Sequence, residues 1–359
     1  MKIRFWSFVN FVISLALNSK FESRNSKQTK KIRNENRLEN SDFEFVSCFG
    51  FRISDLAHCL RTTPKFITTL AFFWAMTSAS FLPAFAAFGA GEGLDEEAKK
   101  WEVSLFESGI KYKEPGLMQE KGSLMGFDLC YTNSFSDRYD ARLEVRSGWG
   151  KVDYDGHVQD LTTGTTYPAT TEDVDDNLIE IRGIWEYGSA GKEGGFWQPY
   201  FGLGYRYLND DSSNMPTTVI INDQTVSIDD LGYQREANYV YLPLGVNCGL
   251  NIESNWLIGL KAEYDLFLGG LQRSHMSDVD PGWNDTHNKQ NSGYGLRGSV
   301  RIAKLDEMQD WFAEPYLIYW NIKKSNNTDD TYYGSHTGWI SWEPKNNSTE
   351  WGVKLGVKF

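Results

Sequence analysis

Cysteine is scarce in this chain of 359 residues, which contains only four. Cys48, Cys59, Cys130 and Cys248 form no CxxC pair and no Cys/His group with zinc-type spacing, so the common cysteine-based metal sites are excluded. Strand alternation assigns Cys130 to an inner face and Cys248 to an outer face. The sequence therefore predicts no disulfide between these two.

Basic side chains are also scarce over most of the chain. Residues 1–86 hold 12 of the 36 basic and 6 of the 48 acidic side chains, so 24 basic groups stand against 42 acidic groups from Ala87 onward, a net charge of −18. Nucleic-acid binding requires a basic surface for phosphate contacts and is disfavoured here. An acidic surface suits binding of cations or repulsion of anions.

Large aromatic side chains, in contrast, are abundant. They make up 15% of the residues, with 13 Trp, 18 Tyr and 22 Phe beside 33 Gly, although mean hydropathy is low. Trp and Tyr are well suited to the two lipid–water boundaries of a membrane barrel, whose strands alternate between lipid and lumen and need no continuous apolar span. The composition indicates a transmembrane β-barrel.

The N-terminal region has the parts of a secretory signal. A basic segment with Arg61 and Lys65 precedes an apolar run that ends at Ala84-Phe85-Ala86, so we expect a signal peptide over 66–86, cleaved before Ala87. A membrane-spanning helix is the alternative. We interpret 1–65 as a mis-assigned or disordered extension, with translation starting near Leu60, and 87–100 as a short periplasmic lead.

From Trp101 to Phe359, stretches with a period of two predict an all-β fold, a transmembrane antiparallel up-and-down barrel of about ten strands, with eight or twelve as alternatives. The expected strands are 101–113, 121–133, 138–150, 177–188, 196–208, 237–250, 256–268, 293–303, 311–323 and 350–359. Short connections alternate with the long ones 151–176, 209–236, 269–292 and 324–349, which matches periplasmic turns and extracellular loops. A soluble sandwich is the alternative, but its strands would seldom end in aromatics.

The last strand shows the alternation clearly. Its apolar positions are Trp351, Val353, Leu355, Val357 and Phe359. We expect them to face lipid and to form the C-terminal signal for the barrel-insertion machinery, with both ends of the mature chain in the periplasm of a bacterial outer membrane.

The opposite faces of the strands point into the lumen, and their charges are nearly balanced. The candidates for ion pairs there are Asp128, Arg142, Glu144, Arg146, Glu180, Arg182, Arg206, Lys261, Glu263, Asp265, Arg297, Arg301 and Lys354, with Asp140, Glu186 and Lys358 on the same faces. About eight strands make a barrel that side chains fill, and about sixteen make an aqueous pore. Ten strands favour a lumen crossed by ion pairs over an ion pathway.

The long loops carry most of the surplus acid. Asp153-Tyr154-Asp155-Gly156 alternates oxygen ligands before a glycine, as in a calcium loop, but the further ligands of such a loop are absent. We therefore interpret the acidic loops as a solvated surface and expect no metal or cofactor. His157, His275 and His336 are isolated in loops and are interpreted as solvated side chains.

The strand count and residues 232–244, GYQREANYVYLPL, resemble small outer-membrane barrels, including the ten-stranded omptins. The resemblance implies a surface protease in which an Asp pair and an Asp-His pair from two outer loops activate water. Asp153 with Asp155, or Asp173 with Asp175, would form the first pair. Asp285 and His287 would form the second.

Three functions remain open at this point. The first is a non-enzymatic outer-membrane protein whose acidic loops form a surface or interaction layer, the second a narrow cation-preferring channel, and the third an omptin-like hydrolase. The partners implied are membrane lipid, the insertion machinery and small cations or extracellular ligands, and not nucleic acid.

Overall fold

The computed structural model describes residues 43–44, 99–160, 163–190, 195–229, 231–252 and 255–359. The proposed extension over 1–65, the signal peptide over 66–86 and most of the lead over 87–100 lie outside the described residues. Within the described part, the only helix is the three-residue turn η2 (Met276–Asp278), so no helix there is long and apolar enough to cross a membrane.

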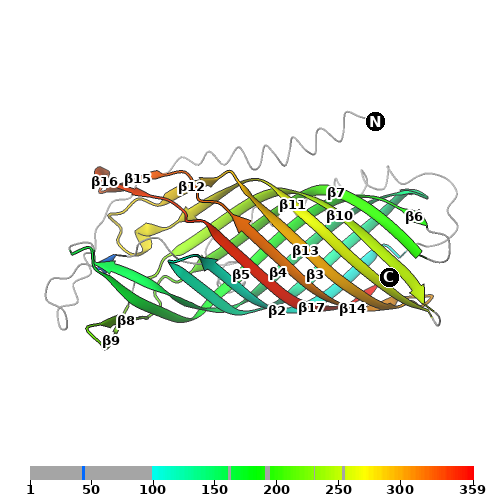
Figure 1. The fold of residues 1–359 in the computed structure, drawn as a ribbon, viewed down its shortest axis with the longest axis horizontal. Helices are drawn as coiled ribbons and strands as arrows, with labels where there is room; N and C mark the ends of the chain where they lie inside the picture. The colour runs from blue at the N-terminus through cyan, green and yellow to red at the C-terminus, as the bar shows by residue number, and fades with distance from the viewer. Residues whose placement is uncertain (1–42, 45–98, 161–162, 191–194, 230, 253–254) are drawn as a thin grey trace, which may run out of the picture.

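Ten antiparallel strands form a closed barrel, as the alternation predicts (Figure 1). They are β2 (Trp101–Glu114), β3 (Met118–Ser136), β4 (Tyr139–Asp160), β5 (Thr166–Tyr187), β7 (Gly195–Asp211), β10 (Gln234–Ile252), β11 (Trp256–Ser274), β13 (Gly293–Lys304), β14 (Asp310–Ile322) and β17 (Asn346–Lys358). Each pairs with the next, and β17 pairs with β2. The backbone groups of Trp101 and Phe359 exchange two hydrogen bonds of 2.8 Å, which joins the first strand to the chain end.

The two ends of the barrel differ. At the turn end, short connections lie beside Trp101 and Phe359; at the loop end, longer excursions carry the hairpins β8 (Thr217–Ile221) with β9 (Gln224–Ile228) and β15 (Thr328–Tyr332) with β16 (Ser335–Ser341), and the strand β12 (Thr286–Gln290) (Figure 1). The described strands also include β1 (Phe43–Glu44), on β4, and β6 (Ser189–Ala190), on β7.

The prediction of a long loop over 151–176 is wrong, because most of this segment belongs to strands β4 and β5. β4 continues to Asp160 and β5 starts at Thr166, and the two pair as far as Gln159 with Thr166. Val152, Tyr154 and Val158 stay buried inside while Asp153, Asp155 and His157 face out. The loop-like composition of this segment reflects an outer face that meets water.

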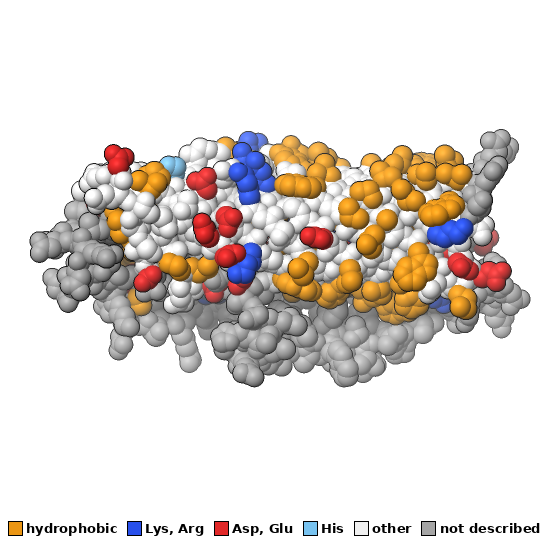
Figure 2. Space-filling view, turned by 90° about the horizontal axis from the view of Figure 1, so that it is seen from below, with side chains coloured by type: hydrophobic (Ala, Val, Ile, Leu, Met, Phe, Trp, Pro, Cys, Tyr) orange, Lys and Arg blue, Asp and Glu red, His pale blue; other side chains and the backbone are white. Residues whose placement is uncertain are grey.

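The outer surface carries an apolar band toward the turn end (Figure 2). Leu105, Leu260 and Leu355 are 68%, 56% and 62% exposed, although leucine is normally buried in water-soluble proteins. Trp101, Trp256 and Trp311 are exposed near the turn end, and Trp149 and Trp351 are exposed farther along their strands toward the loop end. This distribution matches an apolar belt between aromatic girdles.

Candidate functional site

The centre of the lumen is crossed by a buried ion network. Arg297 of β13 donates through Nη1 and Nη2 to both carboxylate oxygens of Glu180 on β5, at 2.7 and 2.6 Å, and through Nε to Asp265 Oδ2 at 2.7 Å. Bidentate pairs of this kind have a defined geometry as well as strength. Because β5 and β13 are separated by three strands around a ring of ten, this pair spans the interior.

A second set of contacts extends the network toward the turn end. Arg182 donates to Glu263 and lies 3.3 Å from Glu144, whose other oxygen is 2.8 Å from Arg142. Tyr200 donates its hydroxyl to Glu263 at 2.6 Å. The carboxylates are therefore each met by a cation or a hydroxyl, as buried charges require.

At the turn end itself the charges are partly hydrated. Arg301 binds both oxygens of Glu102 at 2.7 and 2.8 Å and Glu314 at 2.6 Å, and Lys354 lies 3.2 Å from Asp128. The side chain of Arg301 is 29% exposed, whereas that of Arg297 is 7% exposed. Water therefore reaches the turn-end mouth more readily than the centre.

Toward the loop end the lumen becomes aromatic and apolar. Arg146 donates to Tyr316 Oη at 2.7 Å and to Glu350, with its guanidinium 4.0 Å from the centre of the Phe106 ring. Beyond it, a cavity of about 20 Å³ lies beside Asp176, Arg206 and Trp320, which is room for about one water molecule. Within the described part of the chain, Arg206 has Glu180 at 4.0 Å as its nearest ion-pair partner.

A cluster at the loop-end mouth, which we call the mouth cluster, comprises Glu114, Glu343, Arg235 and Tyr112. Arg235 Nη2 is 3.5 Å from Glu114 Oε1 and donates to Glu343 Oε1, and Tyr112 Oη lies 2.9 and 3.3 Å from the same two oxygens. The carbonyl oxygen of Gln272, with its amide oriented to accept, lies 3.0 Å from Arg235 Nε. Glu343 belongs to the connection from β14 to β17, so the cluster fixes that loop in the mouth.

The two carboxyl groups of the mouth cluster affect each other. Burial and the adjacent Glu343 raise the pKa of Glu114 to about 8, against the lowering effect of Arg235. Burial likewise raises the pKa of Glu343. One arginine cannot stabilise two buried carboxylates, so the pair retains a proton at neutral pH.

All thirteen lumen candidates face inward, and the structure brings them together unequally. Three groups form direct contacts. One joins Glu180, Asp265 and Arg297, and another joins Asp128 and Lys354. The third contains Arg142, Glu144, Arg182 and Glu263, with Lys261 3.8 Å from Glu263. Arg206 lies 4.0 Å from Glu180, whereas Arg146 and Arg301 are paired with residues that the sequence analysis did not single out.

The missed partners divide into two kinds. Glu102, Glu314 and Glu350 lie on expected strands at inward positions, so strict alternation could have found them. Arg235 and Glu343 lie outside the expected strands, and no sequence signal identified them.

Comparisons with known proteins add fold evidence. No family model and no curated protein matches the chain. Among solved structures, the outer membrane protease OmpT from Escherichia coli matches with a TM-score of 0.51 at 11% identity, over 75% of this chain and 99% of that one. The chain has the fold of an outer-membrane β-barrel. The transport unit of the autotransporter AIDA-I from Escherichia coli also matches, with a TM-score of 0.35 at 11% identity over 78% of this chain and 97% of that one.

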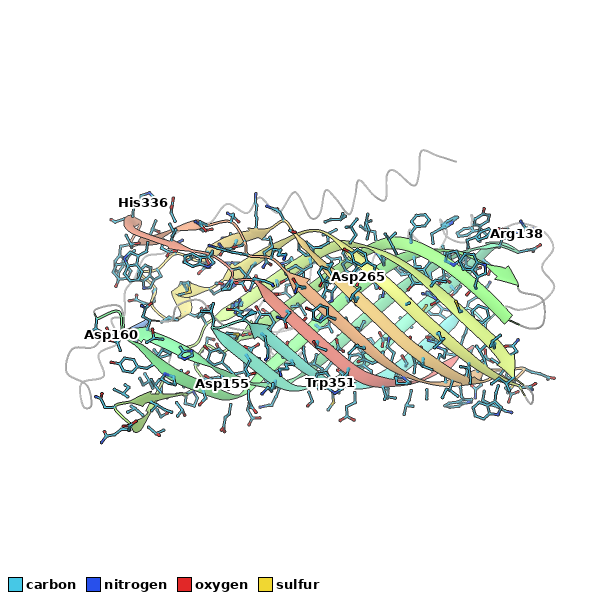
Figure 3. The ribbon with its side chains drawn as sticks, in the orientation of Figure 1. Arg138, Asp155, Asp160, Asp265, His336 and Trp351 are labelled. Carbon is cyan, nitrogen blue, oxygen red and sulfur yellow. The ribbon has the colours of Figure 1, made fainter. Side chains whose placement is uncertain are left out.

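The omptin-like pairs of this outer-membrane β-barrel lie apart in the fold. Asp153 and Asp155 face outward on β4, and the side chain of Asp155 lies at the barrel's outer edge (Figure 3). Asp285 instead accepts hydrogen bonds from Arg273 Nη2 at 2.9 Å and Ser277 Oγ at 2.7 Å, and His287 lies on β12. Asp285 lies in the connection that precedes β12, and both Asp285 and His287 are held against β11.

His275 also departs from expectation, because it is not a solvated side chain. Its Nδ1 lies 3.5 Å from Asp285 and its Nε2 3.6 Å from Glu236, and the side chain is 16% exposed. Hydrogen bonds and the charges of His275 and Arg273 lower the pKa of Asp285, although burial opposes them. This contact attaches the loop after β11 to the barrel rim. No metal-binding group of three or more His, Cys, Asp or Glu occurs in the residues that the structure describes.

Proposed function

We propose that this protein is a sealed outer-membrane barrel with a non-catalytic surface role at its loop end. The observation that carries the proposal is the cross-lumen contact of Arg297 with Glu180, flanked by further buried ion pairs on one side and the mouth cluster on the other. The cavity between these levels, beside Asp176, Arg206 and Trp320, has room for about one water molecule.

The surface role rests on the loop-end extensions. The segment around β16 exposes Trp339, Ile340 and Trp342 at 48%, 46% and 38%, and the β8–β9 hairpin exposes Ile220 at 45%. Exposed aromatic residues on a polar, acidic rim are typical of interaction surfaces. In this proposal the loop end faces the outside of a bacterial cell, and both ends of the mature chain lie in the periplasm.

Planar-bilayer recording of the refolded protein tests the sealed lumen. We expect no reproducible unitary conductance at neutral pH, because every ion would have to displace paired buried charges. Reproducible cation-selective steps would overturn the sealed barrel and support the narrow channel instead. A known porin refolded in the same lipid provides the positive control.

The omptin-like alternative has its own test, a peptide-cleavage assay. If the wild type cleaves the peptide and both Asp285→Ala and His287→Ala do not, the protein is a hydrolase and the proposed surface role is wrong. Equal rates in wild type and both variants would remove that alternative.

The export proposal predicts a processed N-terminus at Ala87. N-terminal sequencing of protein purified from native membranes should read Ala87-Phe88-Gly89, because the small-x-small site precedes this residue. A mature protein that begins upstream of residue 60 would contradict both the signal peptide and the downstream translation start.

A further inference from the structure

One acidic side chain interrupts the apolar band on the outer wall of the barrel. The outward side chains of β2, read from the turn end, are Trp101, Val103, Leu105, Glu107 and Gly109. Glu107 lies directly opposite Met125 on β3 and Val353 on β17, which are 58% and 46% exposed. The outward residues of β3 over 123–131 and of β17 over 351–357 are all uncharged. A single carboxylate therefore lies among apolar side chains on this part of the wall.

Trp351 places Glu107 inside the membrane boundary. It pairs with Gly109 across the β2–β17 seam, and a Cβ on Gly109 would lie 2.7 Å from the indole ring, so the ring lies across the glycine. Glu107 is the next outward residue toward the turn end, on the apolar side of that ring. Exposed tryptophans mark the membrane boundary in such barrels. An ionisable group on the lipid side of this boundary is costly unless it is paired, and it commonly marks a functional contact.

Glu107 has no partner within its own copy. In the described residues, its carboxylate forms no ion pair and no side-chain hydrogen bond, and Met125 and Val353 on either side offer no donor. The nearest lysine along the same outward row is Lys111, four residues away, or about 13 Å at the spacing of a strand. Both side chains point away from the wall, so they do not meet.

Lys111 lacks an anion as well. It forms no ion pair in the part of the chain that the structure describes, and its neighbours on β17 and β3 are Thr349 and Lys121. The charge of Lys113 is the main cause that lowers the pKa of Lys111, and Lys121 adds to it. One row of the wall therefore carries an unpaired anion and an unpaired cation, which makes its charge self-complementary.

A second copy of the chain can bring these two charges together. Two copies in one membrane have the same orientation, so the two-fold axis between them lies along the membrane normal. Barrel strands tilt by about 35–45°, and two facing β2 strands therefore cross. When they cross at Gly109, Lys111 of one copy lies above Glu107 of the other, and the same contact repeats on the opposite side of the axis.

We propose that the wall around Glu107 binds a second copy of this chain, with Glu107 of each copy paired with Lys111 of the other. Met125 and Val353 pack at the centre of this contact, and each lipid-facing carboxylate gains a cation. A second copy is favoured over a different protein because both members of the ion pair belong to the same wall. The proposal concerns the barrel wall and goes beyond the surface role of the loop end.

Energy transfer between donor-labelled and acceptor-labelled copies of the folded full chain tests the contact, in phosphatidylcholine vesicles that carry no net charge. The wild type should show transfer that saturates as the protein-to-lipid ratio rises. E107Q should weaken this association by about tenfold or more, because it leaves Lys111 of the second copy without its anion. The matched control E172Q changes an exposed acid of β5 at the loop end, and its association should stay within about twofold of the wild type.

Charge reversal tests the pairing itself. E107K and K111E should each abolish the transfer, since each variant places like charges together, and the double variant E107K/K111E should restore it. A folding defect in a single variant would not be repaired in this way. Absence of transfer in the wild type at every protein-to-lipid ratio would show that the wall binds no second copy. Equal transfer in the wild type and E107Q, or no recovery in the double variant, would show that Glu107 and Lys111 do not pair across the contact.

Discussion

Arg297→Ala should destabilise the barrel by about 3–5 kcal/mol, the usual cost of removing one partner from a buried ion pair. The variant leaves Glu180 without its bidentate donor and Asp265 without its donor at 2.7 Å. Both carboxylates would then be buried among the strands, and Glu180 would keep Tyr241 Oη at 2.7 Å and the more distant Arg206 at 4.0 Å. Urea unfolding in lipid vesicles, followed by tryptophan fluorescence, measures the loss.

Lys151→Ala provides the comparison for a surface charge. The side chain of Lys151 is 56% exposed and its carboxylate partners are also solvated, so its removal should cost less than about 1 kcal/mol. The double variant Arg297→Leu with Glu180→Leu should recover part of the loss, because it removes the unpaired carboxylate. A loss in Arg297→Ala no larger than that in Lys151→Ala would mean that the network does not stabilise the barrel.

Much of this fold could be predicted because a membrane barrel repeats a simple rule. Along β17, apolar residues alternate with Gly352, Lys354 and Gly356, and a single shift in register would expose charges to lipid. The rule weakens beyond the membrane boundary. On β4, residues such as Asp153 and Asp155 meet water, so the outward face becomes polar and resembles a loop although the strand continues to Asp160.

The partners inside the lumen were harder to predict. Alternation specifies that Arg297 and Glu180 face inward, but their contact depends on the stagger of the strands around the ring, which no single strand encodes. The mouth cluster adds a second difficulty, since Glu343 reaches the lumen from the connection between β14 and β17. Its backbone N–H donates to Ser325 Oγ at 2.8 Å, and no strand register fixes its position. Such contacts follow from tertiary packing and not from periodicity.

Acidification should tighten the closure of the loop-end mouth. Glu114 ordinarily titrates at 4.5, and in the mouth cluster its pKa is raised to about 8. A carboxyl group whose pKa is raised by folding stabilises the folded state when it is protonated, so its whole contribution is present below its ordinary pKa. For Glu114 this contribution to the closed mouth is lost as the pH rises from 4.5 to about 8. The slope is at most about 1.4 kcal/mol per pH unit.

Glu114→Gln removes the titration of Glu114 and leaves Glu343 as the carboxyl group of the mouth cluster that faces Arg235, so the dependence on pH between 4.5 and 8 should flatten. Hydrogen exchange of the segment from Glu343 to Asn346, measured at pH 5, 6.5 and 8, follows the opening directly, and urea unfolding at the same pH values follows the whole barrel. Arg235→Gln is the converse change: it leaves two buried carboxyl groups without a cation, and this segment should exchange faster at every pH. The exchange rates of the wild type are first corrected for the intrinsic effect of pH. Corrected rates that stay constant across this range would show that the two carboxyl groups do not share a proton.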